Sequence, residues 1–207
     1  MTSAASSGYT LRRATPADAP ALARLHLETL PEGVSDLSPL GESLVRHFYT
    51  NVLARGISEV RVAEDPNGLL GFVMVTHDIS TMFPRALLAS LADVVTFVLR
   101  SNPFGLLRAA IAKVSSGTAT VASAPEIVFM GVGQRGRGRG LGAVLMHQGQ
   151  SALHEAGFRS YQLNVHADNE HALKIHLARG FEVVRTFEKG GKKIYLMVCR
   201  TSPPPPL

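Results

Sequence analysis

A run rich in glycine and arginine separates a predicted strand from a predicted helix, and its composition suits phosphate binding. Val132–Gly142 is VGQRGRGRGLG, with five glycines between Gly133 and Gly142. Glycines let successive backbone N–H groups point toward one ligand, and a helix that begins there adds unpaired N–H donors and a partial positive charge. So many glycines weaken local structure, which favours close approach of a ligand over an ordinary connection. We therefore expect the turn to bind a pyrophosphate group.

Two other interpretations of this run are weaker. Gly131–Gly136 satisfies the dinucleotide-binding pattern G-x-G-x-x-G, but the glycines that open the helix are those of Gly138–Gly142. An RGG-like RNA-binding segment is typical of a disordered tail, whereas this run joins a buried strand to an amphipathic helix. We therefore expect no nucleic-acid partner.

Two blocks of residues resemble the GCN5-related N-acetyltransferase (GNAT) superfamily. Arg137–Gly142 (RGRGLG) is similar to the family's R-G-x-G-[IL]-G signature, and Asn169–Phe181 (NEHALKIHLARGF) resembles its N-x-x-A-x-x-x-Y-x-x-x-G-F pattern. One helix and one strand separate the blocks, as that fold requires. The resemblance is specific from about Glu126 to Phe187 and looser toward the N-terminus. It implies an acyl-CoA N-acyltransferase fold with acetyl-CoA as the acyl donor.

The resemblance also implies how acetyl-CoA is held. Backbone groups of the strand that ends at Val132 would pair with the pantetheine amides, and N–H groups of the turn would bind the pyrophosphate. Asn169 would hydrogen-bond the cofactor arm and Ala172 would keep the next helix close; an N-cap and a small packing residue are their structural alternatives. The arginines of the turn would add charge, with at least one of them in solvent. The implied cofactor-binding residues are Met130, Gly131, Val132, Arg137, Gly138, Arg139, Gly140, Leu141, Gly142, Ala143, Asn169 and Ala172.

Two side chains are candidates for proton transfer. An ammonium group, with a pKa of about 10.4, has no lone pair to attack a thioester, so a base or a water chain must take its proton. Glu126 begins the strand that ends at Val132 and, by the period of two, would share a face with Val128, Met130 and Val132. Several family members use an acid in this region; a solvated strand-end carboxylate is the alternative. His176 stands where the family has a proton-donating tyrosine, and is either the acid or a packed structural histidine.

No metal site is expected. His26-Leu27-Glu28 matches the H-x-E of zinc deaminases, but with the single cysteine Cys199 there is no P-C-x-x-C partner. His166, Asp168 and His171 surround a predicted helix start, where loop and capping positions explain them more simply. One cysteine also excludes an intrachain disulfide, and we expect a cytoplasmic protein.

Length and composition predict one globular domain. The chain has 207 residues, of which 45% are hydrophobic and 18% charged, and its net charge of +5 suits an anionic ligand. No stretch reaches the roughly 20 apolar residues that a membrane-spanning helix needs. We expect a single domain over 9–200, with a helical insertion at about 82–117 and flexible tails at 1–8 and 201–207.

The hydrophobic periodicities predict an α/β fold. Strands are expected at 9–13, 59–64, 69–77, 125–132, 160–165, 182–187 and 193–199, and helices at about 16–30, 39–53, 141–156 and 169–179. This order predicts a mixed, mostly antiparallel central sheet of about seven strands with helices on both faces, splayed near its middle.

The resemblance implies transfer of an acetyl group from acetyl-CoA to a primary amine by direct attack. An acyl-CoA-binding regulatory domain with little catalysis is the alternative, because His176 replaces the usual tyrosine. A small-molecule acceptor is expected from the lid-like insertion. The identity of the acceptor, the acyl chain preference and the formation of a homodimer stay open.

Overall fold

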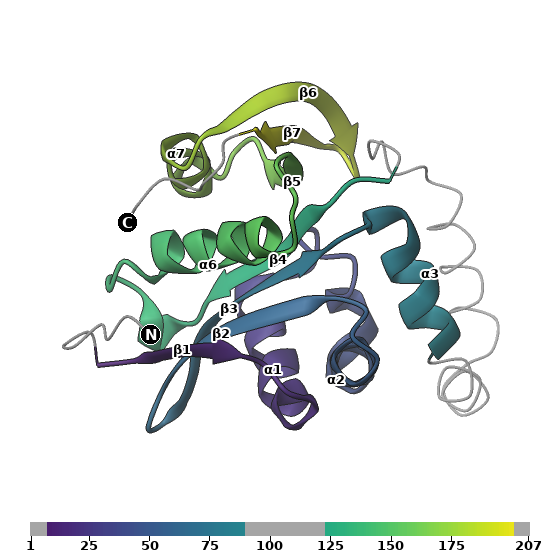
Figure 1. The fold of residues 1–207 in the computed structure, drawn as a ribbon, viewed down its shortest axis with the longest axis vertical. Coiled ribbons are helices and arrows are strands. Elements are labelled where there is room, and N and C mark those ends of the chain that lie inside the picture. Colours follow the sequence, from purple (N-terminus) through teal and green to yellow (C-terminus); the bar gives the residue numbers. More distant parts are fainter. Residues whose placement is uncertain (1–7, 90–122, 201–207) are drawn as a thin grey trace.

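A seven-stranded mixed sheet forms the centre of the protein (Figure 1). The computed structural model describes residues 8–89 and 123–200. The strand order is β1-β2-β3-β4-β5-β7-β6, and neighbouring strands are antiparallel except β4 and β5, which are parallel. This architecture confirms the predicted fold class. The strands are β1 (Thr10–Arg13), β2 (Glu59–Asp65), β3 (Gly68–Thr76), β4 (Glu126–Val132), β5 (Tyr161–His166), β6 (Phe181–Lys189) and β7 (Lys192–Cys199).

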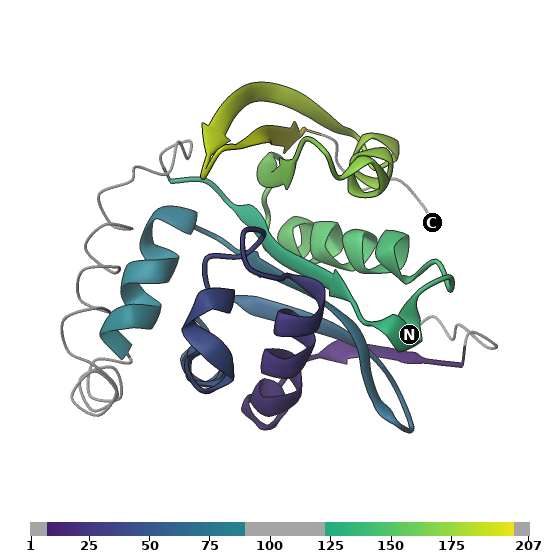
Figure 2. The ribbon, with the colours of Figure 1, turned by 180° about the vertical axis from the view of Figure 1, so that it is seen from behind.

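Helices cover both faces of the sheet (Figures 1 and 2). Helices α1 and α2 lie on one face, α6 packs on the other against β2, β3 and β4, and α7 packs against β6. The insertion predicted for 82–117 begins within α3, and the rest of it lies outside the described residues. The helices are α1 (Ala19–Thr29), α2 (Gly41–Ala54), α3 (Ile79–Ala89), α6 (Leu141–Glu155) and α7 (Glu170–Ala178), with short 3-10 turns η1 (Pro16–Asp18), η2 (Ser38–Leu40) and η3 (Gln134–Gly136).

Strand β3 contributes to a hydrophobic core on each face of the sheet. Phe72 and Met74 enter the core beneath α1 and α2, while Val73 and Val75 enter the core beneath α6. Because helices cover both faces, every residue from Leu70 to Thr76 is buried. This double burial explains why the strand is a nearly continuous apolar run without polar alternation.

Local signals in the sequence fix several helix boundaries. Thr15 and Asp18 form a capping box ahead of α1, in which the Thr15 N–H donates to Asp18 Oδ2 at 2.7 Å. Gly157 and Gly180 follow α6 and α7 with positive φ values of 91° and 83°, a conformation that glycine adopts without a Cβ clash. These starts and stops agree with the prediction, because they depend on residues only a few positions apart.

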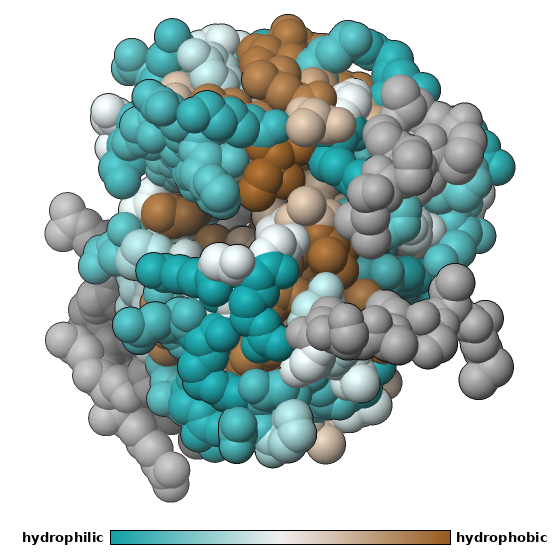
Figure 3. Space-filling model, turned by 90° about the vertical axis from the view of Figure 1, so that its left-hand side faces the viewer, coloured by the Kyte–Doolittle hydropathy of each residue, from teal (hydrophilic) through white to brown (hydrophobic). Residues whose placement is uncertain are grey.

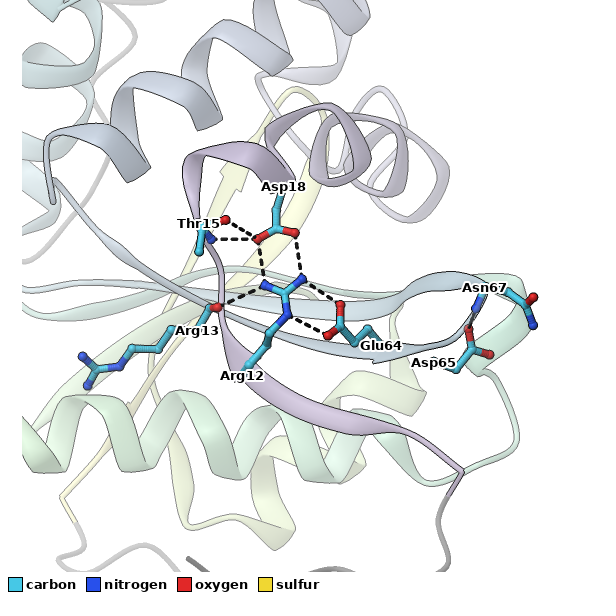
Figure 4. Close-up of polar contacts among 7 residues, drawn as sticks. All are labelled: Arg12, Arg13, Thr15, Asp18, Glu64, Asp65 and Asn67. Carbon is cyan, nitrogen blue, oxygen red and sulfur yellow. Dashed lines mark hydrogen bonds and ion pairs between the residues drawn. The ribbon is translucent and has the colours of Figure 1, made fainter.

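An arginine with two carboxylate partners joins the edge of the sheet to the start of α1 (Figure 4). Arg12 Nε and Nη2 donate to the two oxygens of Glu64, both at 2.7 Å, and Arg12 Nη1 and Nη2 donate to those of Asp18, both at 2.8 Å. The hydrogen bonds from Arg12 lower the pKa of Asp18 to about 2. The two forked pairs tie β1 and β2 to η1 and so fix where α1 leaves the sheet.

Candidate active site

The one parallel pair of strands in the described sheet separates almost at once. β4 and β5 share a single pair in register, Glu126 with Gln162, while β5 pairs with β7 from Tyr161 to His166. Among the described residues, the rest of β4 has no partner strand on this side, so its backbone groups are open to a ligand. Figure 3 faces the side of the molecule on which β4 ends, and shows a hollow with hydrophobic residues at its walls.

The turn after β4 presents backbone donors. The N–H groups of Gly138, Gly140, Leu141 and Gly142 donate no hydrogen bond within the described part of the chain, whereas the N–H of Ala143 bonds the carbonyl of Gly140 at 3.1 Å. Gly140 is the N-cap of α6, with φ of 68°, and Gly138 has φ of 75°. Open donors at the positive end of a 15-residue helix form a suitable site for an anion.

Not all glycines of the run serve this turn. A Cβ at Gly133 would lie 2.8 Å from Leu25 Cδ1, and one at Gly136 would lie 2.7 Å from the carbonyl oxygen of Leu70. Packing inside the protein accounts for these two glycines, at Gly136 against the backbone itself, so no ligand is needed to explain them. At Gly138 and Gly140 the space around a Cβ is open, and the positive φ explains the glycine.

The three arginines of the turn differ in their surroundings. Arg135 forms an ion pair with Asp65 and donates to the carbonyl of Asn67 at 3.1 Å, so it is tied to the β2–β3 turn. The guanidinium of Arg139 lies 5.5 Å from the ring centre of Tyr9. The side chain of Arg137 is exposed and has no ion-pair or hydrogen-bond partner in the described ranges.

A bulge in β4 places Glu126 on the other face of the sheet from Met130 and Val132. The register between β3 and β4 shifts by one residue, which leaves Val128 without a partner on β3. Met130 and Val132 pack on the core beneath α6. The carboxyl of Glu126 instead meets Gln162, which alternates along β5 with residues of that core. The prediction that Glu126 shares a face with Met130 and Val132 is wrong, because the bulge interrupts the period of two.

Glu126 is a buried carboxyl with amide partners. It is 5% exposed, its Oε2 accepts from Gln162 Nε2 at 2.7 Å, and its Oε1 accepts from Asn164 Nδ2 at 3.2 Å. Burial raises its pKa to about 7, against the opposing effects of the two amides and of Lys189. A carboxyl with this pKa takes up and releases protons near neutral pH. Sequence reasoning missed both amides, although polar residues two apart in the otherwise apolar β5 were a signal.

The tip of the β6–β7 hairpin reaches the segment between α1 and α2. Lys189 Nζ donates to Asp36 Oδ2 at 2.5 Å, and Lys192 Nζ lies 3.3 Å from where a Cβ on Gly33 would stand. Lys189 also acts on Glu126 through its charge. The hairpin, this segment and the start of β4 therefore border one region, on the α1 and α2 side of the sheet (Figure 2).

Helix α7 carries the other predicted residues. Asn169 caps it, with its Oδ1 accepting from the Ala172 N–H at 3.1 Å, and Ala172 packs beside the core beneath α6. His176 is 6% exposed, its ring centre lies 5.9 Å from that of Phe181, and its Nδ1 has no hydrogen-bond partner among the described residues. Burial lowers the pKa of His176 to about 4, so its ring is neutral at pH 7.

The residues with metal-ligand spacing are dispersed. His26 is fully buried and bonds Tyr49 Oη at 2.8 Å and Ser35 Oγ at 2.7 Å, which makes it part of the core beneath α1 and α2. Within 8–89 and 123–200, no three His, Cys, Asp or Glu side chains form a cluster that could hold a metal ion. In the same ranges, no helix has the length and hydrophobicity needed to cross a membrane.

Residues 59–181, more than half of the chain, match the Acetyltransferase (GNAT) family. The protein is therefore a member of the GNAT family of acetyltransferases, as the two sequence blocks predicted. The match spans β2 to the first residue of β6 and so includes the turn, the splayed strands and α7. No curated protein sequence matches the chain.

Solved structures agree with this assignment at the level of the fold. A crystal structure of an acetyltransferase is 20% identical, with a TM-score of 0.63 over 92% of this chain and 98% of that one. PaiA N-acetyltransferase from Thermoplasma acidophilum in complex with coenzyme A is 14% identical (TM-score 0.58, 93% and 99% covered). YncA, a putative acetyltransferase from Salmonella typhimurium with its cofactor acetyl-CoA, is 16% identical (TM-score 0.55, 93% and 94% covered).

The buried carboxyl gives a prediction about stability. Glu126→Gln is expected to raise the free energy of unfolding at pH 8 by up to about 3 kcal/mol and to leave it unchanged at pH 4. Burial raises the pKa of Glu126 in the folded protein from 4.5 to about 7, so between these values the folded state binds more protons. The stability of the native protein therefore falls as pH rises through this window, and glutamine, which carries no charge, removes the loss.

Urea unfolding at pH 4, 6 and 8 measures this effect. Glu188→Gln, at an exposed position on β6, is the matched control and should show no comparable pH-dependent gain. An equal effect of Glu126→Gln at pH 4 and pH 8 would contradict a raised pKa for this buried carboxyl.

Proposed function

We propose that the protein transfers an acetyl group from acetyl-CoA to a primary amine of a small molecule. One observation carries the proposal: open N–H groups at Gly138, Gly140, Leu141 and Gly142 stand at the start of α6, directly after a strand whose edge is also open. A pyrophosphate and a chain of amides are the two parts of coenzyme A that such a turn and such a strand edge suit. The family assignment supports the same donor.

The residues present fit this donor. The backbone of Met130 and Val132, on the open part of β4, would pair with the pantetheine amides. The exposed, unpartnered side chain of Arg137 would add charge next to the phosphates, whereas Arg135 is held by Asp65 and is unsuited to this role. Asn169 already uses its oxygen as a cap, which leaves its amide nitrogen for the cofactor arm.

The reaction proposed is direct attack. The neutral amine nitrogen attacks the carbonyl carbon of the thioester, the C–N bond forms, the C–S bond breaks, and coenzyme A leaves as its thiolate. Glu126, directly or through water, takes the proton that the amine loses. Its buried carboxyl suits this step, because a base whose pKa of about 7 matches neutral pH is half ionised there and binds the proton firmly.

His176 is proposed as the residue beside the leaving sulfur, at the position of the family's tyrosine. With a pKa of about 4 the ring carries no charge at neutral pH, so it is a poor source of a whole proton. A neutral imidazole still has one N–H to donate, and the Nδ1 of His176 has no hydrogen-bond partner in the described structure. A hydrogen bond to the developing thiolate is the contribution that this geometry supports.

The acceptor is proposed to approach from the face of α1 and α2. Glu126 lies on that face because of the bulge in β4, and the ion pair of Lys189 with Asp36 joins the hairpin tip to the segment between α1 and α2 close to it. We expect this connection to limit the space open to an acceptor, which favours a small-molecule amine over a polypeptide tail. The insertion at 82–117, on which the sequence-based expectation rested, lies outside the described residues beyond Ala89.

The pyrophosphate site is tested by adding one charge at Gly140. Asparagine and aspartate both tolerate the left-handed conformation that this residue adopts, and they have nearly the same shape. Gly140→Asp places a carboxylate at the helix start, where it repels a phosphate, and should weaken acetyl-CoA binding at least about tenfold more than Gly140→Asn. Calorimetric titration with acetyl-CoA measures the two affinities.

Gly140→Asn is the control for backbone strain and for the loss of glycine itself. Equal affinities for the two variants would place the phosphates elsewhere and so contradict this part of the proposal. The affinities should also converge as salt is raised, because the added repulsion is electrostatic.

A matched pair of substitutions tests His176. Tyrosine and phenylalanine differ by one hydroxyl group, so comparing them removes the effect of size. His176→Phe should lower kcat by about 10-fold to 100-fold and leave acetyl-CoA binding in place, because it lacks a donor for the thiolate, while His176→Tyr should retain activity. Release of coenzyme A with an amine acceptor gives both rates. Equal kcat for the phenylalanine variant and the native protein would show that the position has only a packing role.

A regulatory domain that binds acetyl-CoA with little turnover is the second candidate. The buried, uncharged His176 in place of tyrosine favours it. Native protein that binds acetyl-CoA but releases coenzyme A with no amine faster than it hydrolyses the thioester would support this candidate and exclude the enzyme.

A further inference from the structure

The one pair of residues that keeps β4 and β5 together also brings two polar side chains into contact. Glu126 and Gln162 are 5% and 2% exposed, and they are the single pair in register between these strands. The Gln162 N–H also donates to the carbonyl of Pro125 at 3.0 Å. Backbone and side-chain contacts thus meet at the last point before the strands part.

Each carboxylate oxygen of Glu126 has its own donor. Gln162 Nε2 lies 2.7 Å from Oε2, and Asn164 Nδ2 lies 3.2 Å from Oε1. On β3, Glu126 is paired with Thr76, which is uncharged. On β5, both partners of Glu126 are amides. Lys189 from the hairpin is the one charged group of the described chain that acts on this carboxyl. Besides burial, two neutral amides and the cation of Lys189 therefore determine the pKa of Glu126.

The two amides lower the pKa of Glu126, whereas burial raises it. An N–H that donates to a carboxylate stabilises its ionised form, while removal from water favours the protonated form. Without the amides, the pKa of the buried carboxyl would be higher, and a smaller fraction of it would be ionised and able to act as a base at neutral pH. An amide also has a carbonyl, so after a flip of its plane it accepts a hydrogen bond from the protonated carboxyl. Gln162 is thus able to keep contact with Glu126 in both protonation states.

We propose that Gln162 is a positioning residue for the base, which aims the Glu126 carboxylate toward the acceptor face and stabilises its ionised form through the hydrogen bond from Nε2, with Asn164 as a weaker second donor. This inference rests on the proposed acetyltransferase function. It adds a residue of β5, outside both sequence blocks that identified the family, to the chemistry of the site.

Two readouts test the proposal together. The first is the pH dependence of kcat/KM with acetyl-CoA and an amine acceptor; the second is the pKa of Glu126, followed by carboxyl NMR on protein labelled at glutamate. Gln162→Met keeps the length of the side chain and removes the donor. It should move both the acidic limb of kcat/KM and the Glu126 titration upward by about one pH unit. Asn164→Ala should move both in the same direction by less, since its bond is longer and the residue is exposed.

A matched control tests whether the effect is specific to Gln162, and a second variant replaces Gln162→Met if that protein does not fold. Gln148→Met makes the same chemical change on α6, where this amide bonds Arg61 at 3.1 Å, and should move neither curve. If Gln162→Met does not fold, as thermal unfolding would reveal, Asn164→Ala carries the test because its side chain lies at the surface.

The possible failures are distinct. A Glu126 titration that stays in place in the variants overturns the inference, whatever the activity. A titration that moves while the kcat/KM limb stays overturns the positioning role and leaves the acetyltransferase intact. Native protein that releases no coenzyme A with any amine means that the proposed function itself has failed, and the inference with it.

Discussion

Parallel strands β4 and β5 are in register at one pair of residues, Glu126 and Gln162, and then part. Their separation leaves the edge of β4 beyond Glu126 without a partner strand among the described residues, and this is the edge proposed for the pantetheine chain. The same pair buries a carboxyl at the closed end of the splay, where two amides are the nearest polar groups. The strand edge proposed for the donor and the carboxyl proposed as the base therefore both result from one departure from regular sheet pairing.

The bulge at Val128 determines on which face of the sheet the Glu126 carboxyl lies relative to the later residues of β4. After it, Met130 and Val132 pack on the core beneath α6, whereas Glu126, before it, meets the polar side chains of β5. Without the extra residue, the carboxyl would lie on the same face as Met130 and Val132. Bulges are frequent next to active sites because they redirect a side chain without disturbing the rest of a sheet. Under the proposed function, this bulge would let the acceptor and the donor approach the sheet from different faces.

Charge and backbone polarity are divided between the ends of the site. The start of α6 offers N–H groups that donate no hydrogen bond within the described structure, and the exposed Arg137 stands beside them. At the other end, a carboxyl and two amides surround the place proposed for the amine, with the ion pair of Lys189 and Asp36 nearby. This division of charge would suit the anionic donor and the basic acceptor that we propose.

The fold and the turn could be predicted because local sequence patterns specify them. Contacts between residues far apart in the sequence could not be predicted. Helix caps, the strand–turn–helix unit and the two blocks that resemble the family each lie within a short stretch, and the structure has them at the expected places. The contacts of Gln162 and Asn164 with Glu126 span 36 and 38 residues, so no local pattern marks them as partners. The packing need for Gly136 against Leu70 likewise depends on a neighbouring strand. The form of the insertion beyond Ala89 remains a prediction.

The most direct test of the account is a calorimetric titration of the native protein with acetyl-CoA at low and moderate salt, with NAD and a short RNA as controls. We expect micromolar binding of acetyl-CoA that persists at moderate salt, because backbone N–H groups and the edge of β4 would contribute along with charge. Failure to bind acetyl-CoA, together with binding of NAD or RNA, would contradict it.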